Sequence, residues 1–324
     1  MCAAVRERNV MRGTLVTLGE AVGVVAAVEP GPLAPGAALR MDFAGAEATV
    51  AIGVSRLGHH SVWVGSVGDD AVGTMVLDRL RAERVDVSRC RIDPELPSGL
   101  MVRERRTADH IRATYYRRGL AGSRLSVAQL DTEQIATAGV LHLTGITPAL
   151  SACACDAVHA ALDAAVEAGV PVSLDINYRS ALWSRADAAA ELAKLVSHCD
   201  IVFAGLDEAA LLVPTASASA MAESLAALGP SQVVLKLGGD GALALHRGRV
   251  IRQQAIPVTM VDPVGAGDAF VAGYLAGVLD GTSVRHNLRL AATCGAFAVS
   301  VPGDWAGLPS RRELDLLSGT DIQR

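Results

Sequence analysis

Lysine and aromatic residues are scarce in this chain of 324 residues. Its 29 basic residues include only two lysines, Lys194 and Lys236, and aromatic residues make up 3% of the sequence. The formal net charge is −5, so the chain lacks the basic excess that binds nucleic acids or anionic membranes. We therefore expect neither partner, and a lysine beside a glycine-rich turn stands out as a candidate functional residue.

Long apolar runs and paired cysteines are missing as well. No uncharged apolar stretch reaches 18 residues, which argues against a transmembrane helix. The charges at residues 6–8 are followed by no apolar segment, so we predict no secretory signal. The six cysteines contain no Cys-x-x-Cys pair, and we expect reduced thiols in a cytoplasmic protein. The Cys-Ala-Cys stretch at 153–155 has no His or Cys partner at zinc-ligand spacing.

Apolar strands that alternate with helices dominate the sequence. The strand-like "SVWVGSVG" precedes the helical "DAVGTMVLDRLRAERV", and "GVLHLTGI", "DAVHAALDAAVEAG" and "VPVSLDIN" repeat the pattern. Near-continuous apolar strands alternating with helices indicate a mainly parallel sheet covered on both faces. The predicted fold class is therefore α/β, with a mainly parallel central sheet flanked by helices.

The same pattern predicts one domain over residues 13–311. We expect residues 1–12 to form an N-terminal extension and residues 312–324 a C-terminal tail. Two segments interrupt the strand–helix rhythm: residues 25–43 are rich in Gly, Pro and Ala, and residues 91–118 are charged. We expect both segments to leave the core and form a small β-sheet lid.

The lid carries aromatic and charged residues, among them Tyr115 and Arg117 in "YYRRG". A solvated face is the alternative interpretation for the lid arginines at 103, 105, 106, 112, 117 and 118. A lid of this kind exposes sheet edges, which pairing with a second lid would cover. We therefore expect a homodimer through the lid, or a multiple of it.

The stretch "VDPVGAGDAF" carries the strongest functional signal. An apolar run at helical spacing follows it, so Gly265, Ala266 and Gly267 stand where a helix begins. The first N–H groups of a helix have no internal partner, and such small residues let an anion reach them. Asp268 lies beside them and could take a proton from an attacking hydroxyl. The pattern predicts an anion hole with a general base; a plain glycine-rich turn is the alternative.

Three further stretches carry candidate ligands. "LKLGGDGA" leads from Lys236 into a glycine turn, which is either a nucleotide-phosphate loop or a plain hairpin turn. A common P-loop is excluded because no Gly-Lys dipeptide occurs. "SLDINYR" places Asn177 and Arg179 at the carboxyl end of a strand, where parallel sheets bind ligands. Glu208 in "GLDEAALL" is a candidate ligand of Mg²⁺-bound water, or simply an acid in the first turn of a helix.

Together these motifs resemble the ribokinase-like (PfkB-type) carbohydrate kinases over nearly the whole chain. "DPVGAGDAFVAGYLAG" is similar to the C-terminal signature of that family. "FAGAEATVAIGVSRLG" and the following "VGSVGDDAVG" are similar to its N-terminal signature. Within the family, "YYRRGLAGS", "LHLTGITPALS" and "LDINYRSALWS" are most similar to the 2-keto-3-deoxygluconate kinases.

The resemblance implies a ribokinase-like fold, with ATP and Mg²⁺ as cofactors. It implies phosphoryl transfer to the C6 hydroxyl of 2-keto-3-deoxygluconate or its C4 epimer. Asp268 would be the base, and the anion hole would consist of Gly265, Ala266 and Gly267. The sugar acid would face Gly45, Tyr115, Arg117, Arg179, Asp262 and Asp304. ATP would contact Asn177, Lys236, Gly238, Gly239 and Gly241, and Glu208 would belong to the acidic motif associated with Mg²⁺.

Four positions depart from the family pattern. Ala44 and Thr49 replace a glycine and an asparagine of the N-terminal signature, Met101 replaces a lid tyrosine, and Gly205 replaces an asparagine. We expect these changes to leave phosphoryl transfer intact and to affect the choice of sugar. Another sugar or a nucleoside therefore stays an alternative substrate. A catalytically weak ligand-sensing relative is a second alternative, which the intact Gly-Ala-Gly-Asp disfavours.

Overall fold

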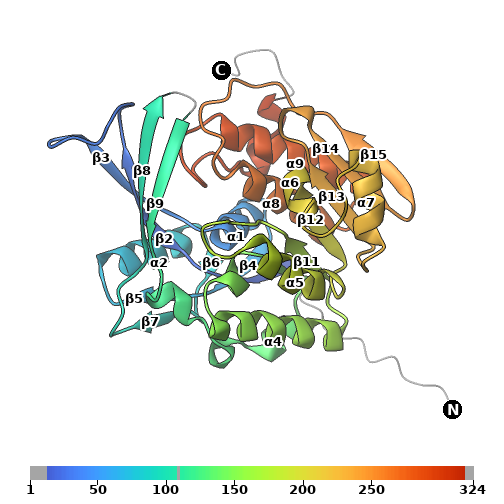
Figure 1. The fold of residues 1–324 in the computed structure, drawn as a ribbon, viewed down its shortest axis with the longest axis horizontal. Helices are drawn as coiled ribbons and strands as arrows, with labels where there is room; N and C mark the ends of the chain where they lie inside the picture. The colour runs from blue at the N-terminus through green and yellow to red at the C-terminus, as the bar shows by residue number, and fades with distance from the viewer. Residues whose placement is uncertain (1–12, 108–109, 318–324) are drawn as a thin grey trace.

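The computed structural model describes residues 13–107 and 110–317 (Figure 1). Its main sheet has nine strands. Their order is β15 (Arg249–Gln253), β14 (Ala242–His246), β13 (Gln232–Lys236), β12 (Ile201–Gly205), β11 (Val172–Asp175), β10 (Val140–Thr144), β1 (Thr14–Leu18), β4 (His60–Val64) and β6 (Val85–Asp86). The strands β6, β4, β1, β10, β11, β12 and β13 run parallel to one another. At the far edge, β14 is antiparallel to β13 and β15 is antiparallel to β14.

Helices cover both faces of this sheet, as the alternation of strands and helices predicts. One face packs against α1 (Ala46–Arg56), α2 (Ala71–Ala82), α8 (Ala266–Leu279) and α9 (Val284–Val299). The other packs against α4 (Ala152–Ala168), α5 (Arg185–Val196) and α7 (Ala218–Ala226). Neighbouring residues of β1 point to opposite cores: Leu15 joins the first cluster and Val16 the second. Because both faces are buried, the central strands are apolar throughout.

Shorter elements complete the described chain. They are β5 (Ser66–Gly68), β7 (Arg91–Asp93), α3 (Thr132–Ala136), α6 (Leu206–Ala209) and the 3₁₀ turns η1 (Ala121–Arg124), η2 (Val127–Gln129), η3 (Thr147–Ala149), η4 (Gly238–Asp240) and η5 (Arg311–Leu317). No helix in the described ranges is both long and apolar enough to cross a membrane.

A second, smaller sheet stands out from the core in Figure 1. Its strand order is β3 (Leu39–Ala44), β2 (Val22–Ala27), β8 (Leu100–Thr107) and β9 (His110–Tyr116). The main sheet with its helices and this smaller sheet confirm the predicted α/β class with a small additional sheet. We call the four strands β3, β2, β8 and β9 the lid sheet.

Two predicted boundaries differ from the structure. Residues 91–99 do not enter the lid sheet, because Arg91–Asp93 pairs parallel with Ser66–Gly68. Asp93 is buried there, and its carboxylate accepts two backbone N–H groups of the next turn. The predicted tail also begins too early, since residues 311–317 form η5 and Leu314 packs against the core. The N-terminal extension at 1–12 lies outside the described residues.

The order in which strands are added to the main sheet reverses at β1. Strands that precede residue 90 lie on one side of β1, and strands from β10 onward lie on the other. In open parallel sheets, ligands bind beyond the carboxyl ends of the strands at such a switch point. The structure therefore directs attention to the residues that follow β1 and β10.

Candidate active site

The predicted anion hole forms the N-terminus of α8. Gly265 precedes the helix with a φ of 75°, in the left-handed region that favours glycine. A Cβ at this position would lie 1.9 Å from the carbonyl oxygen of Asp304, so the close approach also requires glycine. Ala266 and Gly267 then open the helix, whose first N–H groups lack partners inside it.

Asp268 lies in the first turn of the same helix and is half-buried. Burial, and then the charge of Asp175, raise its pKa to about 7, while Lys236 and Arg179 oppose the shift. A carboxylate with a pKa near neutrality suits proton abstraction at physiological pH. Its position and its environment therefore both fit a general base.

Lys236, Asp175 and Glu208 form a charged group beside the anion hole. Nζ of Lys236 lies 2.7 Å from both carboxylate oxygens of Asp175 and 4.0 Å from Oε2 of Glu208. Burial opposes the charge on Lys236, but the two carboxylates outweigh it and raise the pKa of the lysine. Lys236 at the carboxyl end of β13 is thus held by Asp175 at the carboxyl end of β11, and its Nζ lies 3.6 Å from where a Cβ would stand at Gly267 of α8.

A cavity of about 820 Å³ lies between the lid sheet and this end of the core. From the predicted site, the residues that line it are Gly45, Tyr115, Arg117, Arg179, Gly265, Asp268 and Asp304. The structure therefore brings most of the predicted sugar-binding residues together with the predicted base. Ala266 and Gly267 continue from Gly265 along the first turn of α8.

Asp262 is placed differently. It is buried, and it does not line the cavity. One carboxylate oxygen accepts the N–H of Val264 and the other accepts the N–H of Gly303, both at 3.1 Å. In this structure Asp262 joins the turn before α8 to the loop after α9.

The predicted nucleotide-binding residues lie outside the cavity lining. Asn177 is buried just beyond β11 and has a φ of 40°. The turn η4 exposes Gly238 and Gly239, where a Cβ would meet no heavy atom within 4 Å. Gly241 has a φ of 88°, and a Cβ there would lie 2.0 Å from the backbone oxygen of Gln253. The turn is open on one side and is fixed against the antiparallel strands on the other.

Three cavity arginines have different partners. Nη2 of Arg103 donates to both carboxylate oxygens of Asp304, at 2.9 and 2.7 Å. Nε of Arg117 lies 3.0 Å from Oε2 of Glu20. Within the described ranges, no carboxylate pairs with Arg179, whose Nη1 donates to the backbone of the preceding residue. The interpretation of the lid arginines as a solvated face is therefore wrong for Arg103, which is 8% exposed.

The predicted site left out five charged residues that line the cavity, namely Glu20, Glu47, Arg103, Arg112 and Arg118. Glu20 and Glu47 are buried, and each lies at the switch point between β1 and β10. A carboxylate directly after an apolar strand was the available signal for Glu20. The pairing of Arg117 with Glu20 and of Arg103 with Asp304 carried no sequence signal, because the members of each pair are far apart along the chain.

The departures from the family pattern fall into two groups. Ala44 and Met101 line the cavity, so their side chains can affect the fit of a sugar. Thr49 is buried outside the lining, and its hydroxyl has no hydrogen-bond partner in the described part of the chain. Gly205 precedes α6 and donates its N–H to Oε2 of Glu208 at 2.7 Å.

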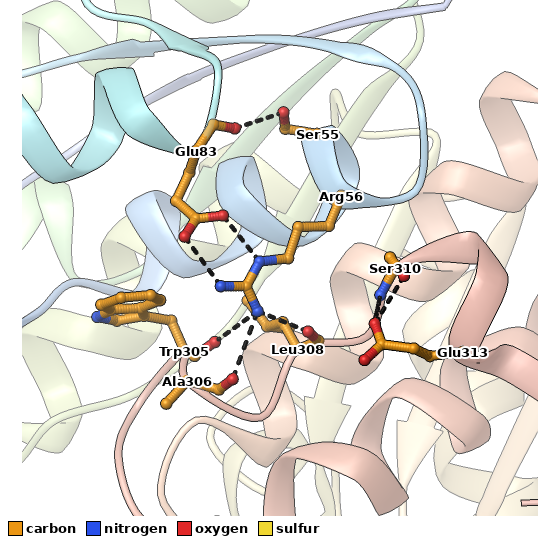
Figure 2. A network of polar contacts seen from close by, with 8 residues as sticks. All are labelled: Ser55, Arg56, Glu83, Trp305, Ala306, Leu308, Ser310 and Glu313. Carbon is orange, nitrogen blue, oxygen red and sulfur yellow. Dashed lines mark hydrogen bonds and ion pairs between the residues drawn. The ribbon is translucent and has the colours of Figure 1, made fainter. Parts of the chain in front are cut away.

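Arg56 anchors the loop that follows α9 (Figure 2). Nε and Nη2 of Arg56 donate to the carboxylate of Glu83 at 2.8 and 2.9 Å. Nη1 donates to the carbonyl of Leu308 at 2.6 Å. The ring of Trp305 stacks on Phe43 of the lid sheet, with ring centroids 5.3 Å apart. One loop therefore contacts the core, the lid sheet and the anion hole.

A separate cluster on α4 and α5 brings Cys155, His159 and Glu191 within 4.8 Å of one another. The expectation that the cysteines at 153–155 have no histidine partner considered only sequence spacing. The carboxylate of Glu191 is already engaged by Nε2 of His159 at 2.5 Å and by Lys194 at 2.8 Å. Burial raises the pKa of the Cys155 thiol to about 11, so in this hydrogen-bonded group the thiol keeps its proton near neutral pH.

Comparison with known proteins identifies the family of this chain. The pfkB family carbohydrate kinase model matches residues 12–311. The 2-dehydro-3-deoxygluconokinase of Bacillus subtilis is 36% identical over 314 residues, covering 94% of this chain and 95% of the relative. The enzyme of the same name from Thermoproteus tenax is 36% identical over 308 residues and covers 94% of both chains.

A solved structure extends the likeness to the fold. The putative ribokinase II of E. coli, in complex with ATP and Mg²⁺, superposes with a TM-score of 0.87 at 24% identity, over 94% of this chain and 99% of that one. The family model and the two kinase relatives show a phosphotransferase that acts on a sugar. The chain belongs to the pfkB family of carbohydrate kinases.

Proposed function

We propose that this kinase transfers the γ-phosphoryl group of ATP to the C6 hydroxyl of 2-keto-3-deoxygluconate or its C4 epimer. The observation that carries the proposal is Arg179, which lines the same cavity as Asp268 and pairs with no carboxylate in the described part of the chain. A guanidinium binds a planar carboxylate with two parallel hydrogen bonds, which a neutral sugar cannot accept. The two relatives named for this sugar acid support the same substrate.

The residues of the site divide the reaction between them. Asp268 takes the proton of the sugar hydroxyl as that oxygen attacks phosphorus. The N–H groups of Gly265, Ala266 and Gly267 stabilise the negative charge on the phosphoryl oxygens in the transition state. Tyr115, Arg117, Arg179 and Asp304 orient the sugar from the lid and the core, and Gly45 lets it approach the start of α1.

The residues also fit ATP and Mg²⁺. The open turn at Gly238 and Gly239, continued by Gly241, leaves space for the nucleotide, with Asn177 and Lys236 at the neighbouring strand ends. Carboxylate oxygens are the ligands that Mg²⁺ prefers, and Glu208 supplies one beside Lys236. Bound Mg²⁺ would neutralise charge on the nucleotide phosphates.

A neutral sugar such as fructose is the alternative that one observation favours. The carboxylate of Glu20, 3.0 Å from Nε of Arg117, already compensates the charge of that arginine. The argument that unpaired arginines exclude neutral sugars therefore applies only to Arg179, which is exposed. The retained Asp268 and intact anion hole argue against a catalytically weak relative.

A coupled assay of ADP release over sugars and sugar acids tests the proposal. We expect 2-keto-3-deoxygluconate or its C4 epimer to exceed fructose and ribose by at least about 10²-fold in kcat/KM. Comparable values for a neutral sugar would reject the sugar-acid assignment and leave the carbohydrate kinase activity in place.

We also propose that the lid sheet pairs with that of a second copy. Its edge strands β3 and β9 have no further strand beside them in the described chain. Leu39, Met41 and Tyr116 on these strands are exposed. Pairing two lid sheets would cover both the open edges and this apolar surface.

A further inference from the structure

Glu20 lines the cavity beside Arg117. It follows β1 directly, at the switch point of the main sheet, and is 4% exposed. Oε2 of its carboxylate lies 3.0 Å from Nε of Arg117, which follows the last lid strand. Both residues line the same cavity. A core strand and the lid sheet are therefore joined by a buried ion pair where the sugar is expected to bind.

The surroundings of Glu20 leave room for its carboxylate. A Cβ at Gly122 would lie 2.5 Å from both Cγ and Oε1 of Glu20. A Cβ at Gly99 would lie 3.4 Å from Oε1. These two glycines come from different segments and approach the same carboxylate, so a side chain at Gly122 would displace it. The position of Glu20 is thus fixed by the fold.

The pair is incompletely satisfied. Oε1 of Glu20 and both Nε and Nη2 of Arg117 are buried and have no hydrogen-bond partner in the described part of the chain, so the contact between the two residues is an ion pair by distance alone. Buried polar atoms without partners cost about 1–3 kcal/mol each, so such atoms in a cavity are typical of a site that awaits a ligand. A carboxylate of a substrate could accept the free N–H groups of Arg117.

The charges around Glu20 are unbalanced. The charged groups that face it in the described chain are Arg117 and Glu47, the latter from the first turn of α1. Glu47 receives hydrogen bonds from Thr144 at 2.5 Å and Thr147 at 2.7 Å, and burial raises its pKa. Burial also raises the pKa of Glu20 to about 7, although Arg117 opposes the shift. A proton can therefore be exchanged at Glu20 near neutral pH.

We propose that Glu20 is the internal counter-ion of Arg117 that the carboxylate of a sugar acid replaces, and that this exchange sets the preference between acidic and neutral substrates. The inference rests on the proposed function, because it requires an anionic sugar. When the acid binds, its carboxylate takes over Arg117 and the Glu20 carboxylate accepts one proton from solvent. A neutral sugar binds without this exchange and leaves the Glu20–Arg117 pair intact.

The proposed exchange predicts the direction in which the Kd of the sugar acid changes with pH. Below about pH 7 Glu20 is protonated, so Arg117 is available and the acid binds at full affinity. Above that pH, binding must add a proton, and the Kd of the acid rises about tenfold for each pH unit. Between pH 6 and pH 8 we expect the Kd of the acid to rise about tenfold in total. The Kd of a neutral sugar is expected to change less than about twofold.

Isothermal titration calorimetry tests the exchange directly. The ligands are 2-keto-3-deoxygluconate and the neutral sugar that carries a hydroxymethyl group in place of its carboxylate. Both are titrated with Mg²⁺ and a non-hydrolysable ATP analogue present, in two buffers of different ionisation enthalpy. For the wild type we expect uptake of about one proton with the acid at pH 8, almost none at pH 6, and none with the neutral sugar.

Two variants locate the proton. Glu20→Gln should abolish the uptake and give the acid at pH 8 the Kd that it has at pH 6. Asp268→Asn is the matched control, since the pKa of Asp268 is also about 7, and it should keep the uptake. Thermal melts check that both variants fold, and the wild-type measurement stands even if Glu20→Gln does not.

The outcomes separate the two proposals. If the acid binds the wild type without proton uptake at pH 8, or if Glu20→Gln keeps the uptake, the role of Glu20 is wrong and the proposed function stands. If Asp268→Asn loses the uptake, Asp268 is its source and the role of Glu20 is again wrong. If the neutral sugar binds at pH 6 and the acid does not, both proposals fail.

Discussion

The two ends of the cavity are built in different ways. At the phosphoryl end, the proposed anion hole and Asp268 belong to α8, and the Lys236–Asp175 pair joins β13 and β11 of the main sheet. At the sugar end, Arg103 and Arg117 come from the lid sheet and pair with residues of the core, Asp304 and Glu20. The first arrangement is held by the backbone of one rigid core, whereas the second depends on ion pairs between two sheets.

The difference indicates which property each end controls. Groups on rigid elements keep the geometry that phosphoryl transfer needs, independently of the sugar. Ion pairs between separate sheets can be exchanged for a ligand, so they suit the choice of substrate. We therefore expect changes at the phosphoryl end to lower turnover for every substrate, and changes at the sugar end to alter selectivity.

Asp268→Asn should have the largest effect. Asparagine is nearly isosteric but cannot accept the proton, so we expect kcat to fall about 10²–10⁴-fold for acid and neutral sugars alike. Steady-state kinetics with both substrates measure this, with ATP binding as the control. A loss of less than about tenfold, or a loss confined to one sugar, would contradict the division between the two ends.

The dependence of wild-type kcat/KM on pH also tests whether Asp268 is the base. A base works only when ionised, and the pKa of Asp268 is raised to about 7. With a neutral sugar, kcat/KM should therefore rise tenfold per pH unit below about pH 7 and level off above it. Activity with that sugar that falls steadily between pH 6 and pH 8 would show that Asp268 is not the base.

Arg179→Ala should have a smaller and selective effect. Loss of one charge-assisted contact is worth about 1.5–3 kcal/mol, so kcat/KM for the sugar acid should fall about 10- to 100-fold. The value for a neutral sugar should stay within about twofold. Arg118→Ala is the matched control, because Arg118 is also an exposed arginine on the cavity wall. An equal loss for both sugars would place Arg179 with the phosphoryl end instead.

Met41→Glu should have the smallest effect on the chemistry. Met41 is 49% exposed on the edge strand β3, and a charge there opposes lid pairing. Light scattering should give twice the chain mass of 33.4 kDa for the wild type and a smaller average mass for the variant. Activity should change by less than about threefold, since Met41 does not line the cavity. A wild-type monomer at micromolar concentration would reject the dimer.

The same division explains how much the sequence could predict. The α/β class, the helix that begins at the Gly-Ala-Gly and the lid sheet follow from local periodicity and turn residues. The anion hole, Asp268 and the glycine turn were recognisable because each is a short continuous motif. The pairs Arg103–Asp304 and Arg117–Glu20 were not, because their members are distant in the chain and meet only when two sheets are assembled. Asp262 shows the reverse case: its motif was clear, but its carboxylate holds two loops together.

The Arg56 anchor in Figure 2 has a consequence for how the protein is made. Arg56 and Glu83 leave the ribosome early, but the carbonyl that Arg56 binds belongs to Leu308, 252 residues further along. Contacts so distant in sequence close late in folding, after the loop-closure entropy has been overcome. The anion hole rests against this last loop through Gly265 and Asp304. A nascent chain that has already formed the main sheet therefore lacks a finished phosphate site until almost its entire length has been synthesised.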